Sequence, residues 1–143
     1  MVAGPAGVGK TSLIHALRKN DAAVRKTQAI TFIGGAIDTP GEYAQIPRFY
    51  SALMVTSLAA EVVLLLSDAA ADAVALPPNF AAMFIRPVVG VVTKIDLPTA
   101  DPAKAERRLR LAGVLSPVFP VSVVSGEGID ALYQFLEERR CDI

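Results

Sequence analysis

The chain has 143 residues, of which 52% are hydrophobic and 20% are charged. This composition excludes a disordered chain and suits a sheet covered on both faces, and the length predicts one domain over residues 1–143. Fourteen basic residues balance fourteen acidic ones, which leaves no broad positive surface for nucleic acid, and the single cysteine, Cys141, fits a reducing cytosol.

The first feature along the chain is a glycine-rich loop after a very short apolar strand at residues 1–3. The loop reads GPAGVGKT and matches the phosphate-binding pattern G-x-x-x-x-G-K-[ST] at every fixed position. Its backbone N–H groups can point at phosphate oxygens, Lys10 can reach the β- and γ-phosphates, and the Thr11 hydroxyl can help to hold Mg²⁺. The predicted nucleotide-binding residues here are Gly4, Pro5, Ala6, Gly7, Val8, Gly9, Lys10, Thr11 and Ser12.

Two explanations fit the shortness of the first strand. Either the chain starts inside a longer natural reading frame, or the strand is trimmed.

Beyond the loop, the apolar pattern predicts strands that alternate with helices. Strands are expected at residues 28–33, 36–39, 61–67, 88–93 and 117–122. Helices are expected after the loop to about residue 19, at 48–59, at 78–84, from 102 to the Gly113 stop, and from 129 onward. Glu61 interrupts the apolar stretch at residues 49–66, so we expect no contact with a membrane. The fold class predicted is α/β, with a mostly parallel six-stranded sheet between two helix layers, as in P-loop nucleotide-binding domains.

A second group of polar residues lies in and around the strand at residues 36–39. Asp38 can hold Mg²⁺, often through water, and the Gly41 N–H can bond the γ-phosphate. Thr27, in a polar link, is expected to close on the metal and the γ-phosphate. The plainer alternatives are an ordinary turn after the strand and a surface threonine. The metal site predicted is therefore Thr11, Thr27 and Asp38, with Lys10, Thr27 and Gly41 as the catalytic groups.

A third group predicts which base is bound. Thr93 ends a buried strand, and Lys94 and Asp96 follow it at the edge of the sheet where the loop lies. A carboxylate at Asp96 can accept hydrogen bonds from N1–H and the 2-amino group of guanine, which adenine lacks, and the Lys94 stem can lie over the base. Backbone N–H groups at Ser122 and Val123 are expected near the guanine carbonyl. The alternative is a simple turn at the end of the strand.

This order of motifs resembles the translation-factor and Ras-like class of P-loop GTPases. Further runs resemble the EutP/PduV family of small P-loop proteins from bacterial ethanolamine and propanediol utilisation. These runs are KTQAITF (26–32), AIDTPGEY (36–43), RFYSAL (48–53), PPNFAAMF (77–84), PVVGVVTKIDL (87–97) and FPVSVVSGEGID (119–130). The resemblance implies a cytoplasmic protein associated with bacterial microcompartments, and it covers almost the whole chain.

Several residues depart from an efficient Ras-like site. Glu42 stands where those enzymes place a water-orienting glutamine, Ala6 would crowd an arginine from a partner, and Gly7 replaces the asparagine of potassium-activated GTPases. We therefore expect slow, Mg²⁺-dependent hydrolysis of GTP to GDP. A second hypothesis, which the resemblance implies, is an ATP-dependent acetate kinase that uses Arg25 or Lys26. A third is a nucleotide-gated adaptor for a microcompartment shell protein or a pathway enzyme.

Overall fold

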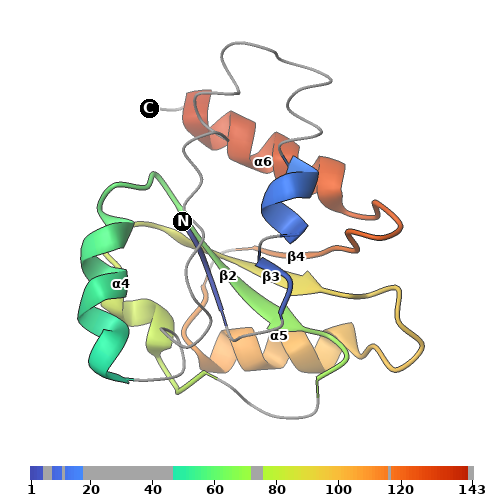
Figure 1. Ribbon diagram of the computed structural model, residues 1–143, viewed down its shortest axis with the longest axis horizontal. Helices are drawn as coiled ribbons and strands as arrows, with labels where there is room; N and C mark the ends of the chain where they lie inside the picture. The colour runs from blue at the N-terminus through green and yellow to red at the C-terminus, as the bar shows by residue number, and fades with distance from the viewer. Residues whose placement is uncertain (5–7, 11, 18–46, 72–75, 116, 142–143) are drawn as a thin grey trace.

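The computed structural model describes residues 1–4, 8–10, 12–17, 47–71, 76–115 and 117–141 (Figure 1). Its strands are β1 (Val2–Ala3), β2 (Val63–Asp68), β3 (Val88–Thr93) and β4 (Val118–Pro120). Residues 10 and 12–17 are helical, and the later helices are α4 (Tyr50–Ser57), α5 (Pro102–Leu111) and α6 (Ile129–Cys141). Two short 3₁₀ helices, η1 (Pro47–Phe49) and η2 (Phe80–Met83), complete the described elements.

The described strands form one parallel sheet in the order β1-β2-β3-β4. The long central pair is in register from Val63 opposite Val88 to Asp68 opposite Thr93. The structure confirms an α/β architecture with a parallel sheet. The sheet has four strands within the described residues and not the six expected, and the segments expected to supply the other two, 28–33 and 36–39, lie outside them.

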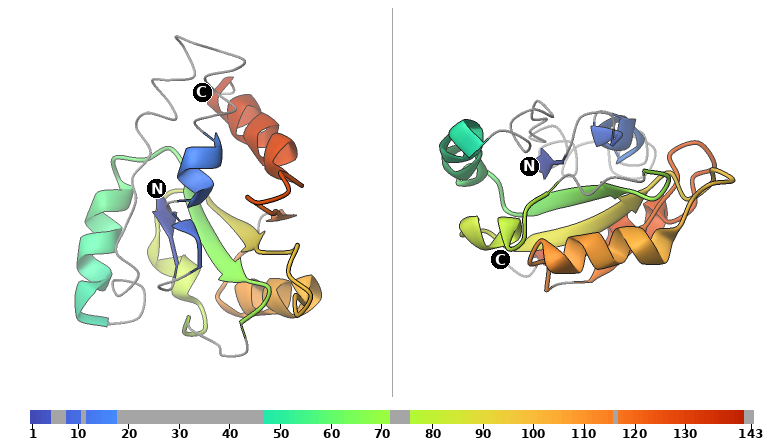
Figure 2. Two further views of the ribbon diagram at one scale, coloured as in Figure 1. Left: turned by 45° about the vertical axis from the view of Figure 1, so that its right-hand side comes forward. Right: turned by 90° about the horizontal axis from the view of Figure 1, so that it is seen from below.

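Helices cover both faces of the sheet (Figure 2). Side chains alternate along a strand, so Leu64 and Leu66 of β2 pack on one side, while Val63 and Leu65 pack on the other. The first side is covered by the helical segment 12–17 and by α6, and the second by α4, η2 and α5. The first four residues of β2, VLLL, are all apolar, as expected for a strand that is buried on both faces.

Helix α5 begins and ends where its sequence predicts. The Asp101 side chain accepts a hydrogen bond from the Lys104 N–H at 3.1 Å, and Pro102 occupies the first turn. At the other end, Gly113 has a φ of 98°, the left-handed conformation that ends many helices. The Asp101 N–H also donates to the Ala69 carbonyl at 2.7 Å, which fixes the start of α5 beside the end of β2.

Other expected elements are present with shifted bounds. The helix expected at 48–59 is η1 followed by α4, and the segment expected to be helical at 78–84 is the 3₁₀ helix η2. The strand expected at 117–122 ends at Pro120, because the Ser122 N–H donates to the Glu127 carbonyl at 2.9 Å and the chain turns there. In the described ranges, no helix combines the length and apolarity needed to cross a membrane.

The residue before the short strand β1 is held on both sides of its backbone. The Met1 ammonium donates to the Val62 carbonyl at 2.8 Å, and the Met1 carbonyl accepts from the Leu64 N–H at 2.8 Å. Burial lowers the pKa of this ammonium to about 6, because the charged form is poorly solvated there. The expectation of a very short first strand is therefore confirmed.

Two glycines in the loop before α6 differ in what a side chain would meet. Gly126 and Gly128 have φ values of 83° and 79°, but a Cβ at Gly128 would collide with the Pro120 carbonyl oxygen, whereas one at Gly126 would meet open space. We expect Gly126→Ala to lower the free energy of unfolding by about 1 kcal/mol through backbone strain, and Gly128→Ala by at least about 3 kcal/mol. Urea unfolding of both variants measures this difference, and equal losses would contradict it.

Candidate nucleotide site

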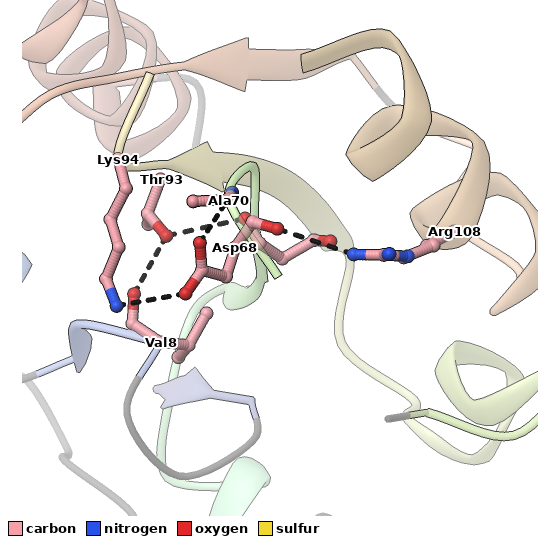
Figure 3. Close-up of polar contacts among 7 residues, drawn as sticks. Val8, Asp68, Ala70, Thr93, Lys94 and Arg108 are labelled. Atoms are coloured by element: carbon pink, nitrogen blue, oxygen red, sulfur yellow. Dashed lines mark hydrogen bonds and ion pairs between the residues drawn. The ribbon is translucent and has the colours of Figure 1, made fainter. Parts of the chain in front are cut away.

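The candidate site lies at the carboxyl edge of the sheet. The four described strands are parallel, so their carboxyl ends meet at this edge: Gly4 lies after β1, Asp68 at the end of β2, Lys94 after β3 and Ser122 after β4. Residues from four distant parts of the sequence therefore come together, and Figure 3 shows the polar contacts at the ends of β2 and β3.

The described part of the glycine-rich loop holds its lysine close to the backbone. Lys10 is 7% exposed, and its ammonium donates to the Gly4 carbonyl at 3.1 Å. The Leu13 N–H donates to the Gly9 carbonyl at 3.0 Å, so the helix begins directly after the loop. A buried cation next to a helix N-terminus suits an anionic ligand. Ser12 is exposed on that helix, and Pro5, Ala6, Gly7 and Thr11 lie outside the described residues.

Thr93 ties the loop to the end of β3. Its Oγ1 lies 2.8 Å from the Val8 carbonyl oxygen, to which it donates, and 3.4 Å from the carbonyl oxygen of Ser67 (Figure 3). Thr93 is 2% exposed, so this hydrogen bond is shielded from water. The glycine-rich loop and the turn that carries Asp96 are thus joined by one buried contact.

Ser122 orients the exposed Asp96. The Ser122 hydroxyl donates to Asp96 Oδ1 at 2.7 Å and accepts from the Ser125 N–H at 3.1 Å. The Ser122 N–H donates to the Glu127 carbonyl, and the contact of this N–H with the guanine carbonyl stays a prediction. Val123, the other predicted contact, is half-buried and packs against the core.

Asp68 lies at this site although no sequence motif predicts it there. Its Oδ2 lies 2.9 Å from the Lys94 ammonium, its Oδ1 accepts from the Ala70 N–H at 2.8 Å, and its carbonyl oxygen accepts from Arg108 at 3.4 Å (Figure 3). Lys94 itself has a φ of 62°, unusual for a residue with a side chain. The signal that could have found Asp68 is its position, since it ends a buried parallel strand as Thr93 does.

The remaining predicted residues are not located by the structure. Thr27, Asp38 and Gly41 lie outside the described residues, as do Glu42 and the pair Arg25 and Lys26. In the part of the chain that the structure describes, no group of three His, Cys, Asp or Glu side chains could hold a metal ion. The metal site therefore stays a prediction from the sequence.

Comparison with known proteins places the chain in a family. The sequence model PduV-EutP, described as ethanolamine utilisation - propanediol utilisation, matches residues 1–138. The chain belongs to the PduV-EutP family. It is 37% identical to the propanediol utilization protein PduV of Citrobacter freundii, over 97% of this chain and 93% of that protein. It is 33% identical to the probable acetate kinase EutP of Escherichia coli K12, over 93% of this chain and 85% of that protein.

A more distant likeness joins this PduV-EutP chain to a translation factor. Translation initiation factor IF-2 of Aquifex aeolicus is 30% identical over 95% of this chain, which corresponds to 19% of the factor. The matching segment is therefore one small part of a much larger protein. This likeness agrees with the P-loop fold that the sequence predicts.

A substitution at Thr93 tests the buried contact with the loop. Thr93→Val keeps the shape of the side chain but leaves the Val8 carbonyl without its donor, so we expect the free energy of unfolding to fall by about 1–3 kcal/mol. The matched control is Thr99→Val on the exposed surface, expected to change it by less than about 0.5 kcal/mol. Denaturant unfolding compares the two, and equal effects would show that the contact contributes nothing.

Proposed function

We propose that this protein binds guanine nucleotides at the carboxyl edge of its sheet and is a slow, Mg²⁺-dependent GTPase. The observation that carries the proposal is the Thr93 hydroxyl, which donates to the Val8 carbonyl of the glycine-rich loop. Through it, the residues proposed to hold phosphate and those proposed to read the base belong to one connected unit. A nucleotide that spans the two would meet a preformed site, which reduces the entropy lost on binding.

Asp96 is the residue proposed to select guanine. Its side chain is exposed, and the buried Ser122 hydroxyl holds one of its carboxylate oxygens at 2.7 Å. A carboxylate fixed in this way can accept hydrogen bonds from N1–H and the 2-amino group of guanine. Adenine offers neither donor, so binding it would desolvate the charge without compensation.

Lys10 is the residue proposed to bind the β- and γ-phosphates. In the structure its ammonium donates to the Gly4 carbonyl, within the loop itself. We propose that phosphate oxygens replace this carbonyl as acceptor when a nucleotide binds, and that Lys10 then stabilises the charge that develops during hydrolysis. Backbone N–H groups of the loop from Ala6 to Ser12 would share this role.

Mg²⁺ is proposed to bind at Thr11, Thr27 and Asp38, on the sequence alone. A magnesium ion so bound would neutralise phosphate charge during transfer. Gly41 would contact the γ-phosphate. Slow turnover is proposed because Glu42 lacks the amide donor of a water-orienting glutamine and because the Ala6 methyl leaves little room for an added arginine.

A pathway role follows from the family and remains part of the proposal. The relatives are named for propanediol and ethanolamine utilisation, so we propose that this protein serves such a pathway in the cytoplasm, in association with a bacterial microcompartment. A shell protein or a pathway enzyme would then be its partner. In that role it could also act as an adaptor whose docking depends on the bound nucleotide, without catalysis.

A second candidate function is an acetate kinase, favoured by the name of the relative from Escherichia coli. In that reaction an acetate oxygen attacks the γ-phosphorus of ATP, the bond from that phosphorus to the bridging oxygen breaks, and ADP leaves. The site would need a cation for the acetate carboxylate, and Arg25 and Lys26 are the candidates from the sequence.

The base preference tests the guanine assignment. We expect calorimetric titration to show GDP binding at least about a hundredfold tighter than ADP, since the carboxylate pairs only with guanine. Asp96→Asn should lose this preference and favour xanthosine diphosphate, because the asparagine amide can donate to the 2-oxo group that replaces the amino group. Asp130→Asn, an exposed position on α6, is the matched control and should leave the preference unchanged. Equal or tighter binding of ADP would overturn the assignment.

The reaction itself distinguishes the three candidate functions. We expect single-turnover GTP hydrolysis no faster than about 10⁻³ per second, abolished by Lys10→Ala. Acetyl phosphate formed from ATP and acetate faster than this, and lost in the same variant, would replace the GTPase with the kinase. Nucleotide binding with neither reaction measurable would leave the adaptor. Rapid hydrolysis by the isolated protein would contradict the argument from Glu42 and Ala6.

A further inference from the structure

One ion pair at the candidate site involves a residue that is not predicted to contact the nucleotide. It joins Asp68 at the end of β2 to Lys94 just after β3, with 2.9 Å between Oδ2 and Nζ. The Asp68 side chain is 19% exposed and the Lys94 side chain 37%, so the pair is partly shielded from water at the edge of the sheet. Figure 3 shows the Lys94 stem running alongside Thr93 toward the Asp68 carboxylate.

Asp68 is held through its carboxylate and through the backbone around it. The Ala70 N–H donates to Oδ1 at 2.8 Å, and the Asp68 carbonyl oxygen accepts from Arg108 of α5 at 3.4 Å. The next carbonyl, that of Ala69, accepts from the Asp101 N–H at 2.7 Å. Asp68 is therefore a fixed acceptor between the sheet and α5, and the ammonium that it binds is restrained in turn.

An unrestrained lysine side chain is poorly suited to pack against a flat base, because its long stem samples many rotamers. Contact with a base would have to offset the entropy lost when the stem becomes ordered. At Lys94 the backbone is already in the left-handed region, with φ at 62°, and the ammonium is held at the far end of the stem. Both ends of the stem are thus restrained before any ligand arrives.

We propose that Asp68 is a positioning residue of the nucleotide site, which orders the Lys94 stem beside the place of the base. The proposal rests on the proposed function, since it assumes that a base lies near Lys94 and Asp96. Asp68 does not touch the nucleotide in this account. Its effect is to make binding tighter for any base that can lie against the stem, while Asp96 decides which base is preferred.

A double-mutant cycle tests this account. Asp68→Asn keeps an oxygen that can accept from the Ala70 N–H and removes only the charge, and Lys94→Met keeps an apolar stem without the ammonium. We expect Asp68→Asn to weaken GDP binding about fivefold in the natural background, and less than about twofold when Lys94→Met is already present. Inosine diphosphate lacks the 2-amino group. Asp68→Asn should weaken its binding by the same factor as the binding of GDP, so the ratio of the two affinities stays constant.

The controls separate this proposal from the proposed function and from a general loss of folding. Asp130→Asn removes one negative charge elsewhere and should bind GDP within about twofold of the unchanged protein. If Asp68→Asn does not fold, Lys94→Met by itself must weaken the binding of GDP about fivefold. Equal losses in both backgrounds, or unchanged binding in Asp68→Asn, would overturn the role of Asp68. Failure of the unchanged protein to prefer GDP over ADP would overturn the proposed function instead.

Discussion

The hydrogen bond from the Thr93 hydroxyl to the Val8 carbonyl is the contact on which the rest of the candidate site depends. It spans 2.8 Å but joins residues 85 positions apart in the sequence. On one side of it stands the loop with Lys10, and on the other the turn with Lys94 and Asp96. A threonine can make this bond because its short side chain at the end of a buried strand reaches the neighbouring backbone. The same hydroxyl lies 3.4 Å from the Ser67 carbonyl, so the loop after β1, the end of β2 and the end of β3 meet at this point.

Polar groups at the edge of the sheet are arranged in two connected layers. The inner layer is buried and consists of Lys10, Thr93 and Ser122, whose polar atoms bond backbone carbonyls or a carboxylate. The outer layer is more exposed and includes Lys94 and Asp96. Each outer side chain is held by a partner, Lys94 by Asp68 and Asp96 by Ser122. Such support is what a binding site requires to present its groups in one geometry.

The proposed function distinguishes the residues that bind the nucleotide from the residues that act in its hydrolysis. The groups whose positions the structure describes are among those proposed to bind phosphate and base, and each is held by a contact of its own. The departures at Ala6 and Glu42 affect the groups proposed to act during hydrolysis. In our proposal, a site with this combination binds a nucleotide better than it cleaves one. Because the chain belongs to the PduV-EutP family, we propose that its role lies in propanediol or ethanolamine utilisation.

The sequence by itself determined the type and order of most elements and the family. The buried strands are recognisable because both faces are covered, which leaves a continuous apolar run such as VLLL (63–66) in β2. The capping of α5 by Asp101 is equally local. Both the buried strands and this cap can therefore be predicted without knowing which distant residues they contact. Tertiary structure decided the partners of the polar side chains. Asp68 and Lys94 are 26 residues apart, as are Ser122 and Asp96, and only the parallel order of the strands brings each pair together. Register between strands depends on packing across the whole sheet, and for that reason no local pattern showed that Asp68 would hold Lys94.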